Sequence, residues 1–146
     1  MSIIIRKAGV ADLPAVYELI KEFAVFQKTP GKLLISAEQM VKDKDIFCCF
    51  VAVDESGTIA GFASFYFTYF SWSGKGMYLD DLYVKENFRK QQLGKRLLQA
   101  VIDFAKKENC KKLRWQVSGW NSNAIEFYKK VGAVIDDTEI NCDLNL

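Results

Sequence analysis

Apolar residues recur at helical spacing along two stretches of the chain. The first begins after Asp12, with Pro14 in its first turn. The side of this helix that we expect to be buried consists of Leu13, Val16, Tyr17, Ile20, Phe23 and Ala24. The second stretch covers residues 93–108, and its inward side consists of Leu93, Leu97, Leu98, Val101, Ile102 and Ala105. Capping residues predict two shorter helices, from Ser36 to about Lys44 and from Asn121 to Lys130.

Short runs rich in β-branched and aromatic residues predict strands between these helices. We expect strands at residues 3–5, 47–53, 58–72, 77–84, 113–117 and 140–144. Turns are predicted at 55–57 and 73–76, so consecutive strands in the first half of the chain should be antiparallel. The order of elements predicts an α/β fold with a mixed, largely antiparallel sheet and helices on both faces.

Composition limits the size of the protein and the chemistry open to it. The chain has 146 residues, half of them apolar, with no repeat or linker, so one domain over residues 1–146 is expected. It contains no histidine, the commonest general base and a common metal ligand. Mechanisms of the Ser-His-Asp and Cys-His types are therefore excluded, and no metal is expected. Proton transfer would fall to carboxylates, tyrosine, cysteine, lysine or water.

Cysteine spacing and hydropathy predict the compartment. The four cysteines form no C-x-x-C pair, and the first residues lack the charged-then-apolar layout of an export signal. We therefore expect reduced thiols and a cytoplasmic protein. No uncharged apolar run reaches the ~18 residues of a membrane span, so no membrane association is expected.

The junction between strand 77–84 and helix 93–108 carries the strongest chemical signal. The first amides of a helix have no partners within the helix, and the helix dipole makes them attractive to anions. Gly94 would let a ligand approach the backbone, and Arg89, Lys90, Lys95 and Arg96 add positive charge. A phosphate or pyrophosphate is the natural ligand, and an ordinary solvated helix start is the alternative. A nucleic-acid surface is disfavoured, because the net charge is only +2.

Two motifs resemble those of the GNAT N-acetyltransferase superfamily. Arg89-Lys-Gln-Gln-Leu-Gly94 resembles its R/Q-x-x-G-x-G/A motif, with Gln92 in place of the first glycine. Residues 121–133, which include Tyr128, resemble its N-x-x-A-x-x-[FY]-Y-x-x-x-G-[FA] segment. The resemblance implies an N-acetyltransferase that uses acetyl-CoA. It implies these cofactor-binding residues: Leu82, Tyr83, Val84, Arg89, Lys90, Gln91, Gln92, Leu93, Gly94, Lys95 and Asn121.

Residues 65–72 and 78–84 are similar to the spermidine/spermine (diamine) acetyltransferases. That similarity implies a homodimer that acetylates a primary amine of a polyamine or a lysine-like small molecule. Gln27 and Phe70 stand where this subfamily has acidic residues, so a polyamine is only one candidate acceptor. A protein N-terminus, a lysine side chain, an aminoglycoside and a non-catalytic CoA-binding domain remain alternatives.

The resemblance also implies individual roles. Tyr128 would protonate the departing thiolate, although a core aromatic at this position is the alternative. Asp80 would bind the amine or act as a base through water, whereas Asp81 would either help to bind the substrate or be structural, near a strand irregularity. Adjacent strand residues point to opposite faces, so only one of the two should face the site, unless both are simply exposed polar residues.

Further roles are expected for the strand and for two aromatic residues. Leu82 and Val84 would offer backbone groups to pantetheine, one amide acting as an oxyanion donor. Tyr69 and Trp72 could line an amine pocket through cation–π contacts. Asn121 could touch pantetheine, although helix capping explains it equally well.

Overall fold

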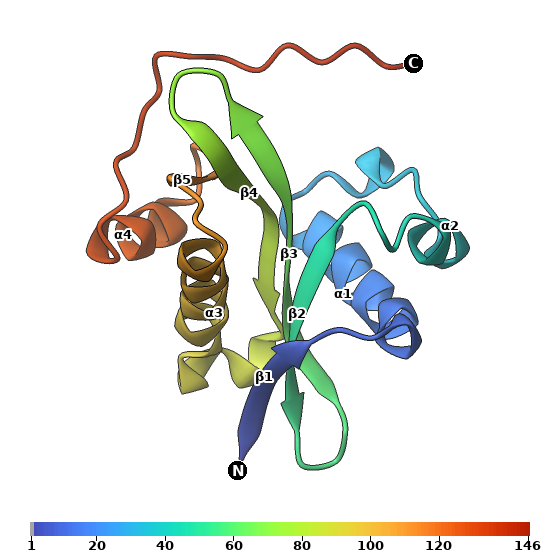
Figure 1. Cartoon of the computed structure of the whole chain (residues 1–146). Coiled ribbons are helices and arrows are strands. Elements are labelled where there is room, and N and C mark those ends of the chain that lie inside the picture. Colours follow the sequence, from blue (N-terminus) through green and yellow to red (C-terminus); the bar gives the residue numbers. More distant parts are fainter. Residues whose placement is uncertain (1) are drawn as a thin grey trace. The chain divides into compact units, whose positions relative to one another are not determined.

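The computed structural model describes residues 2–146 and divides the chain into two compact units, residues 1–116 and 117–146. The first unit contains a five-stranded sheet in the order β1-β2-β3-β4-β5 (Figure 1). Its strands are β1 (Ile3–Lys7), β2 (Cys48–Asp54), β3 (Ile59–Phe70), β4 (Gly74–Val84) and β5 (Lys112–Trp115). Only β4 and β5 pair in parallel; the other neighbours are antiparallel. The predicted mixed, largely antiparallel sheet is confirmed.

Helices cover both faces of this sheet, as predicted (Figure 1). One face carries α1 (Leu13–Phe26) and α2 (Ala37–Lys42), and the other carries α3 (Leu93–Lys107). Short 3₁₀ helices occur at η1 (Val10–Asp12), η2 (Pro30–Lys32) and η3 (Glu86–Gln91). All the predicted inward residues of α3 are buried except Ile102, which is half-buried.

Each face of the sheet has its own core. On the α1 side, Leu13, Val16 and Leu19 pack with Met40 of α2 and with strand residues that include Phe62. On the α3 side, Phe104 contacts the rings of Phe50, Phe65 and Phe67, with centroids 5.8–6.0 Å apart. Packing of these large apolar side chains holds the helices against the sheet.

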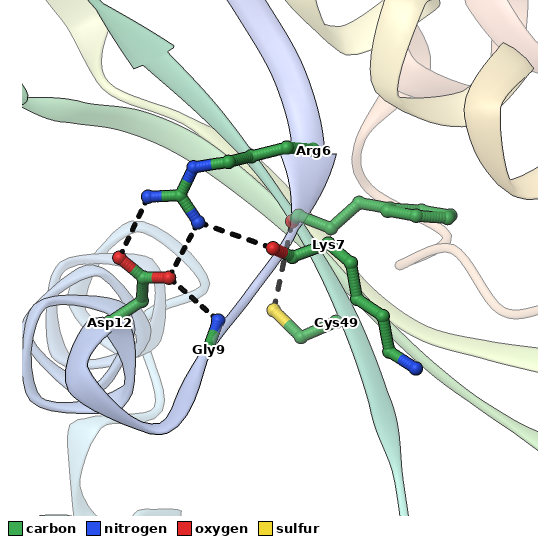
Figure 2. A network of polar contacts seen from close by, with 6 residues as sticks. Arg6, Lys7, Gly9, Asp12 and Cys49 are labelled. Carbon is green, nitrogen blue, oxygen red and sulfur yellow. Dashed lines mark hydrogen bonds and ion pairs between the residues drawn. The ribbon is translucent and has the colours of Figure 1, made fainter.

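The start of α1 is held differently from a simple side-chain cap (Figure 2). The Asp12 carboxylate makes no capping hydrogen bond to α1; it accepts one from the Gly9 amide at 2.7 Å. Both its oxygens also accept from the Arg6 guanidinium, at 2.7 and 3.0 Å. The hydrogen bond from Arg6 is the main reason that the pKa of Asp12 is lowered. This bidentate pair joins β1 to the beginning of α1.

The turn between β3 and β4 begins earlier than predicted. The strands pair as far as Phe70 and Gly74, so residues 71–73 form the turn and β4 begins at Gly74 instead of Met77. Gly74 has a φ of +91°, which favours glycine. Gly76 stays in the strand, and a Cβ there would lie 2.4 Å from Cε2 of Phe70. Packing between Phe70 and Gly76 thus extends the hairpin.

The second unit contains α4 (Ser122–Lys130). The side chain of Asn121 accepts a hydrogen bond from the Ala124 amide at 3.2 Å, which confirms the predicted cap. The predicted strand at 140–144 is wrong: this segment forms no strand, and Ile140 and Leu144 are 87% and 84% exposed. A strand needs a partner for its backbone groups, and the segment pairs with no strand of residues 2–146. No helix in residues 2–146 is long and apolar enough to cross a bilayer.

Candidate active site

A β-bulge in β4 is the central feature of the candidate site. Leu79 pairs with Phe65 and Asp81 pairs with Ser64, so Asp80 is an extra residue on β4. The parallel pairing with β5 also stops here, its last pair being Leu79 and Trp115. Beyond the bulge, the edge of β4 that β5 would occupy is therefore open within residues 2–116.

The hydrogen-bonding pattern identifies which backbone groups line this open edge. The Lys85 amide donates to the Ala60 carbonyl at 2.8 Å, and Gly61 pairs with Val84 in register. In an antiparallel ladder this makes Gly61 and Val84 a non-hydrogen-bonded pair, and the pattern alternates along the strand. Val84 and Leu82 consequently direct their amide and carbonyl groups away from β3. The Val84 carbonyl accepts from Nε of Arg89 at 2.9 Å, and the amides of both residues face the open edge.

The first turn of α3 lies beside the end of this edge. A Cβ built on Gly94 would meet only Cγ2 of Val84, at 4.0 Å, so no protein atom requires glycine there. The Gln92 carbonyl accepts the first intrahelical hydrogen bond, from the Arg96 amide. The amides of residues 93–95 precede that bond and have no partner within the helix. The polar turn predicted before α3 is the 3₁₀ helix η3, whose Phe88 is buried.

Gln92 adopts a left-handed backbone conformation, with φ 57° and ψ 28°. The first glycine of the motif would occupy this position, and glycine adopts this conformation without the steric cost that a Cβ brings. The backbone at this position therefore takes a conformation that the missing glycine would adopt at lower cost, and the Gln92 amide is retained.

We expect Gln92→Gly to raise the free energy of unfolding by about 1 kcal/mol, because the left-handed turn would no longer strain a side chain. Urea denaturation measures this change. Asn109→Gly is the matched control, since Asn109 also has a positive φ (62°) but asparagine tolerates it better. A destabilised Gln92→Gly variant would contradict a left-handed turn at this position.

Two of the predicted cationic residues are engaged with the protein. The guanidinium of Arg89 lies 5.2 Å from the Phe26 ring centroid and 5.5 Å from that of Tyr83, besides its bond to Val84. Nη2 of Arg96 donates to the Ile3 carbonyl at 2.7 Å. Arg89 thus fastens η3 to β4, and Arg96 fastens α3 to β1. Lys90 and Lys95 are exposed beside the turn.

Tyr83 is also used for packing. It is buried, stacks on Phe23 with centroids 5.1 Å apart, and donates from its hydroxyl to Glu22 at 3.3 Å. Its side chain therefore faces α1, and only its backbone lies in the strand that borders the site.

The two carboxylates at the bulge influence each other. Asp80 retains an exposed side chain, yet surrounding protein atoms desolvate it enough to raise its pKa. Burial, and then the charge of Asp80, raise the pKa of Asp81 to about 7. Both carboxylates also raise the pKa of the Tyr78 phenol. The strict alternation expected for adjacent strand residues does not hold here, because the extra residue of the bulge interrupts it.

Three side chains that the sequence did not single out, those of Tyr66, Tyr78 and Arg114, lie together on neighbouring strands just before the bulge. Tyr66 stacks on Tyr78 with centroids 5.4 Å apart, and Arg114 is the register partner of Tyr78 on β5. The guanidinium of Arg114 lies 4.8 Å from the ring of Phe70. Tyr78 could have been found from the sequence, because it lies two residues before Asp80 on the same predicted strand. Arg114 could not, because its place beside Tyr78 depends on strand pairing across more than 30 residues of chain.

The remaining predicted residues are dispersed. Tyr69, near the end of β3, is 77% exposed, and Trp72, in the β3–β4 turn, is fully exposed; their role in an amine pocket stays a prediction. Gln27 follows α1 as its C-cap. Asn121 and Tyr128 belong to the second unit, where Tyr128 is buried and its ring contacts Phe127.

A shallow cavity of about 420 Å³ lies elsewhere, between α1 and the β2–β3 turn, and Lys85 borders it. None of the predicted site residues lines it. Neither Asp80 nor Asp81 lines it, so the open edge of β4 is the better candidate for chemistry.

Comparison with known proteins identifies the family. The model of the acetyltransferase (GNAT) family matches residues 13–133. The thialysine N-epsilon-acetyltransferase of Sus scrofa is 31% identical over 143 residues, which cover 90% of this chain and 84% of that protein. The human spermidine/spermine N(1)-acetyltransferase-like protein 1 is 32% identical over 140 residues, covering 89% of this chain but 20% of that protein.

A solved structure has the same fold. The aminoglycoside acetyltransferase meta-AAC0020, from an uncultured soil metagenomic sample, superposes with a TM-score of 0.81 at 23% identity, covering 99% of this chain and 96% of that one. The family match and the 31% identity over most of the porcine relative's length, together with this fold, lead to one conclusion. The chain belongs to the GNAT acetyltransferase family and is an N-acetyltransferase.

Proposed function

We propose that this protein transfers the acetyl group of acetyl-CoA to a primary amine of a polyamine or a lysine-like small molecule, in a ternary complex. The observation that carries the proposal is the open edge of β4, which begins at the bulge at Asp80 and ends beside Gly94. Residues 13–133 match the family across both units, which supports one acetyltransferase domain over residues 1–146.

The residues present fit acetyl-CoA, which supplies the activated acetyl group. The outward amides of Leu82 and Val84 can hold an extended amide chain such as pantetheine, as an added strand would be held. The first-turn amides at Leu93, Gly94 and Lys95 form an anion site for the pyrophosphate, and the space above Gly94 suits it. Gln91, Gln92 and Lys90 border the same turn. Arg89 keeps this loop in place instead of pairing with phosphate.

The carboxylate pair can handle the acceptor amine. A primary amine arrives as an ammonium and must lose a proton before it can attack. Asp80 is exposed and can bind the ammonium, while Asp81, with a pKa of about 7, is well matched to accept a proton near neutral pH. Tyr128, from the second motif, is the proposed donor of a proton to the departing thiolate.

We also propose that the protein is a homodimer in the cytoplasm. The similarity of residues 65–72 and 78–84 to diamine acetyltransferases supports a homodimer. The four cysteines are all free thiols in the structure, which supports a reducing compartment such as the cytoplasm.

An acetylation assay tests the proposed function. Purified protein and acetyl-CoA would be combined with polyamines, lysine analogues, aminoglycosides and peptides, and release of free thiol would be followed. We expect turnover with small primary amines. Turnover only with peptides would overturn the proposed acceptor class, and thiol release with none of the amines would overturn the enzyme assignment.

The pH dependence tests the role of Asp81. Its ionised form accepts the proton, so kcat should rise with pH through about 7. Its stability effect has the opposite sign. A carboxyl whose folded pKa is raised from 3.8 stabilises the fold fully below that value, and this stabilisation is lost as the pH approaches 7. Asp81→Asn should therefore lower kcat and abolish the rise of kcat with pH near 7. At pH 8 its free energy of unfolding should be higher than that of wild type.

Asp103→Asn, an exposed change on α3, is the control and should leave both profiles unchanged. The role of Asp81 as proton acceptor is wrong if kcat of Asp81→Asn still rises with pH near 7, or if the variant is less stable at pH 8 but has unchanged turnover.

A further inference from the structure

A row of side chains crosses three strands on the α1 side of the sheet. Tyr66 of β3 stacks on Tyr78 of β4, with ring centroids 5.4 Å apart and ring planes inclined by 30°. Arg114 of β5 is the register partner of Tyr78. The bulge residue Asp80 follows two positions after Tyr78 on β4. A half-buried aromatic surface therefore lies between a carboxylate pair and a guanidinium.

The charges at both ends of this row act on the Tyr78 phenol. Burial raises the pKa of its phenol most, and the charges of Tyr66, Asp80 and Asp81 raise it further. Arg114 acts in the opposite direction and lowers the pKa of Tyr78. One phenol thus lies within range of negative charge from the bulge and positive charge from β5.

The guanidinium of Arg114 is positioned by an aromatic ring and not by a carboxylate. It lies 4.8 Å from the ring centroid of Phe70, and Nζ of Lys112 lies 5.2 Å from the same centroid. The Phe70 ring packs directly against Gly76, where a Cβ would lie 2.4 Å from Cε2 of Phe70. Within residues 2–146, no Asp or Glu forms an ion pair with Arg114.

A guanidinium held in this way is suited to bind an anion. Contact with a ring engages the face of the group and leaves its N–H donors available at the edges. A carboxylate accepts two of these donors in parallel, a geometry that lysine cannot offer. The second cation of a diamine would instead meet Arg114 and Lys112, which repel it.

We propose that Arg114 is a specificity-determining residue that binds a carboxylate of the acceptor while Asp80 receives its primary amine. The preferred acceptor is then an amino acid with a terminal or side-chain amine, and polyamines are disfavoured. This inference rests on the proposed function, since it concerns the acceptor of the same site. The distance that the acceptor must bridge is two residues along β4 and one strand across, which a chain of a few methylenes can span.

A series of acceptors of equal chain length tests the inference. 6-Aminohexanoate, hexylamine and 1,6-diaminohexane all carry a primary amine at one end of a six-carbon chain. The other end is a carboxylate, a methyl group or a second amine, and is therefore anionic, neutral or cationic. For wild type we expect kcat/KM to fall in that order, with the carboxylate about 10- to 100-fold better than the diamine. Calorimetric titration of each acceptor into the full chain with CoA should give the same order of affinities.

Variants at Arg114 isolate the group responsible. Arg114→Gln should remove the preference while activity with hexylamine remains near wild type, and Arg114→Glu should reverse the order. Lys107→Gln, an exposed lysine on α3, is the matched charge control and should keep the wild-type order.

The outcomes separate this inference from the proposed function. Equal kcat/KM for the three acceptors, or an equal loss for all three in Arg114→Gln, overturns the role of Arg114 and leaves amine acetylation intact. Affinities that depend on Arg114 in the predicted order, without turnover of any amine, support the recognition and overturn the proposed acetyl transfer. Absence of both binding and turnover overturns the inference as well.

Discussion

Tyr128→Phe is expected to slow acetyl transfer by about 10²- to 10⁴-fold, because that is the usual contribution of a general acid. The ring remains, so its contact with Phe127 in α4 should survive and the variant should fold. Acetyl-CoA affinity should be unchanged, since the hydroxyl is needed only when the thiolate departs. The loss should shrink with an acyl donor whose thiol is more acidic, because such a thiolate leaves without a proton. Steady-state kinetics and calorimetric binding on one preparation measure these effects.

Tyr17→Phe is the matched control for loss of a hydroxyl. The Tyr17 hydroxyl donates to the Ile35 carbonyl at 2.9 Å, so this variant should lose about 1 kcal/mol of stability and keep its turnover. If Tyr128→Phe behaves in the same way, with lower stability and full activity, Tyr128 is a packing residue and water protonates the thiolate.

Gly94→Asp is expected to weaken acetyl-CoA binding at least about 100-fold from a micromolar-range affinity. The change adds bulk and negative charge to the first turn of α3, where we propose that the pyrophosphate binds. The fold should tolerate it, because a Cβ at this position meets only Val84, at 4.0 Å. Calorimetry measures the affinity, and thermal unfolding tests whether the fold is retained.

Two further glycine variants complete this experiment. Gly31→Asp adds the same side chain at an exposed glycine with no atom within 4 Å of its Cβ position, and should leave binding unchanged. Gly94→Ala should stabilise the fold by about 0.5 kcal/mol, because alanine favours a helix over glycine, and yet weaken acetyl-CoA binding. Unchanged affinity in Gly94→Asp would show that the pyrophosphate binds elsewhere.

Much of the candidate site follows from local rules. The periodic apolar residues of 93–107, the turn before them and the glycine at 94 predict a helix start that can bind an anion, and α3 begins at Leu93 as expected. Ser36 and Asn121 predict their caps correctly, since each side chain accepts from an amide three residues later. Such signals act within a few residues, so they can be read without knowing what lies across the fold.

Other parts of the site depend on contacts between distant residues. The position of Arg89 in the motif predicted a phosphate ligand. Its guanidinium instead contacts the rings of Phe26 and Tyr83 and donates to the carbonyl of Val84. Residues 140–144 had the composition of a strand, but no strand of residues 2–146 pairs with them. Propensity describes what a segment can form, whereas pairing and packing decide what it does form.

The sequence by itself determined the family, the helix start that suits a pyrophosphate, and the order of elements as far as α4, but not the fate of residues 140–144. Tertiary structure alone decided that Asp80 is the extra residue of a bulge, beyond which β5 no longer pairs with β4. It also decided that burial, and then the charge of Asp80, raise the pKa of Asp81 to about 7. It also decided that Arg114 lies across from Tyr78 and against Phe70. Helix periodicity and capping are encoded within one or two turns, but strand register and desolvation depend on segments far apart in the chain.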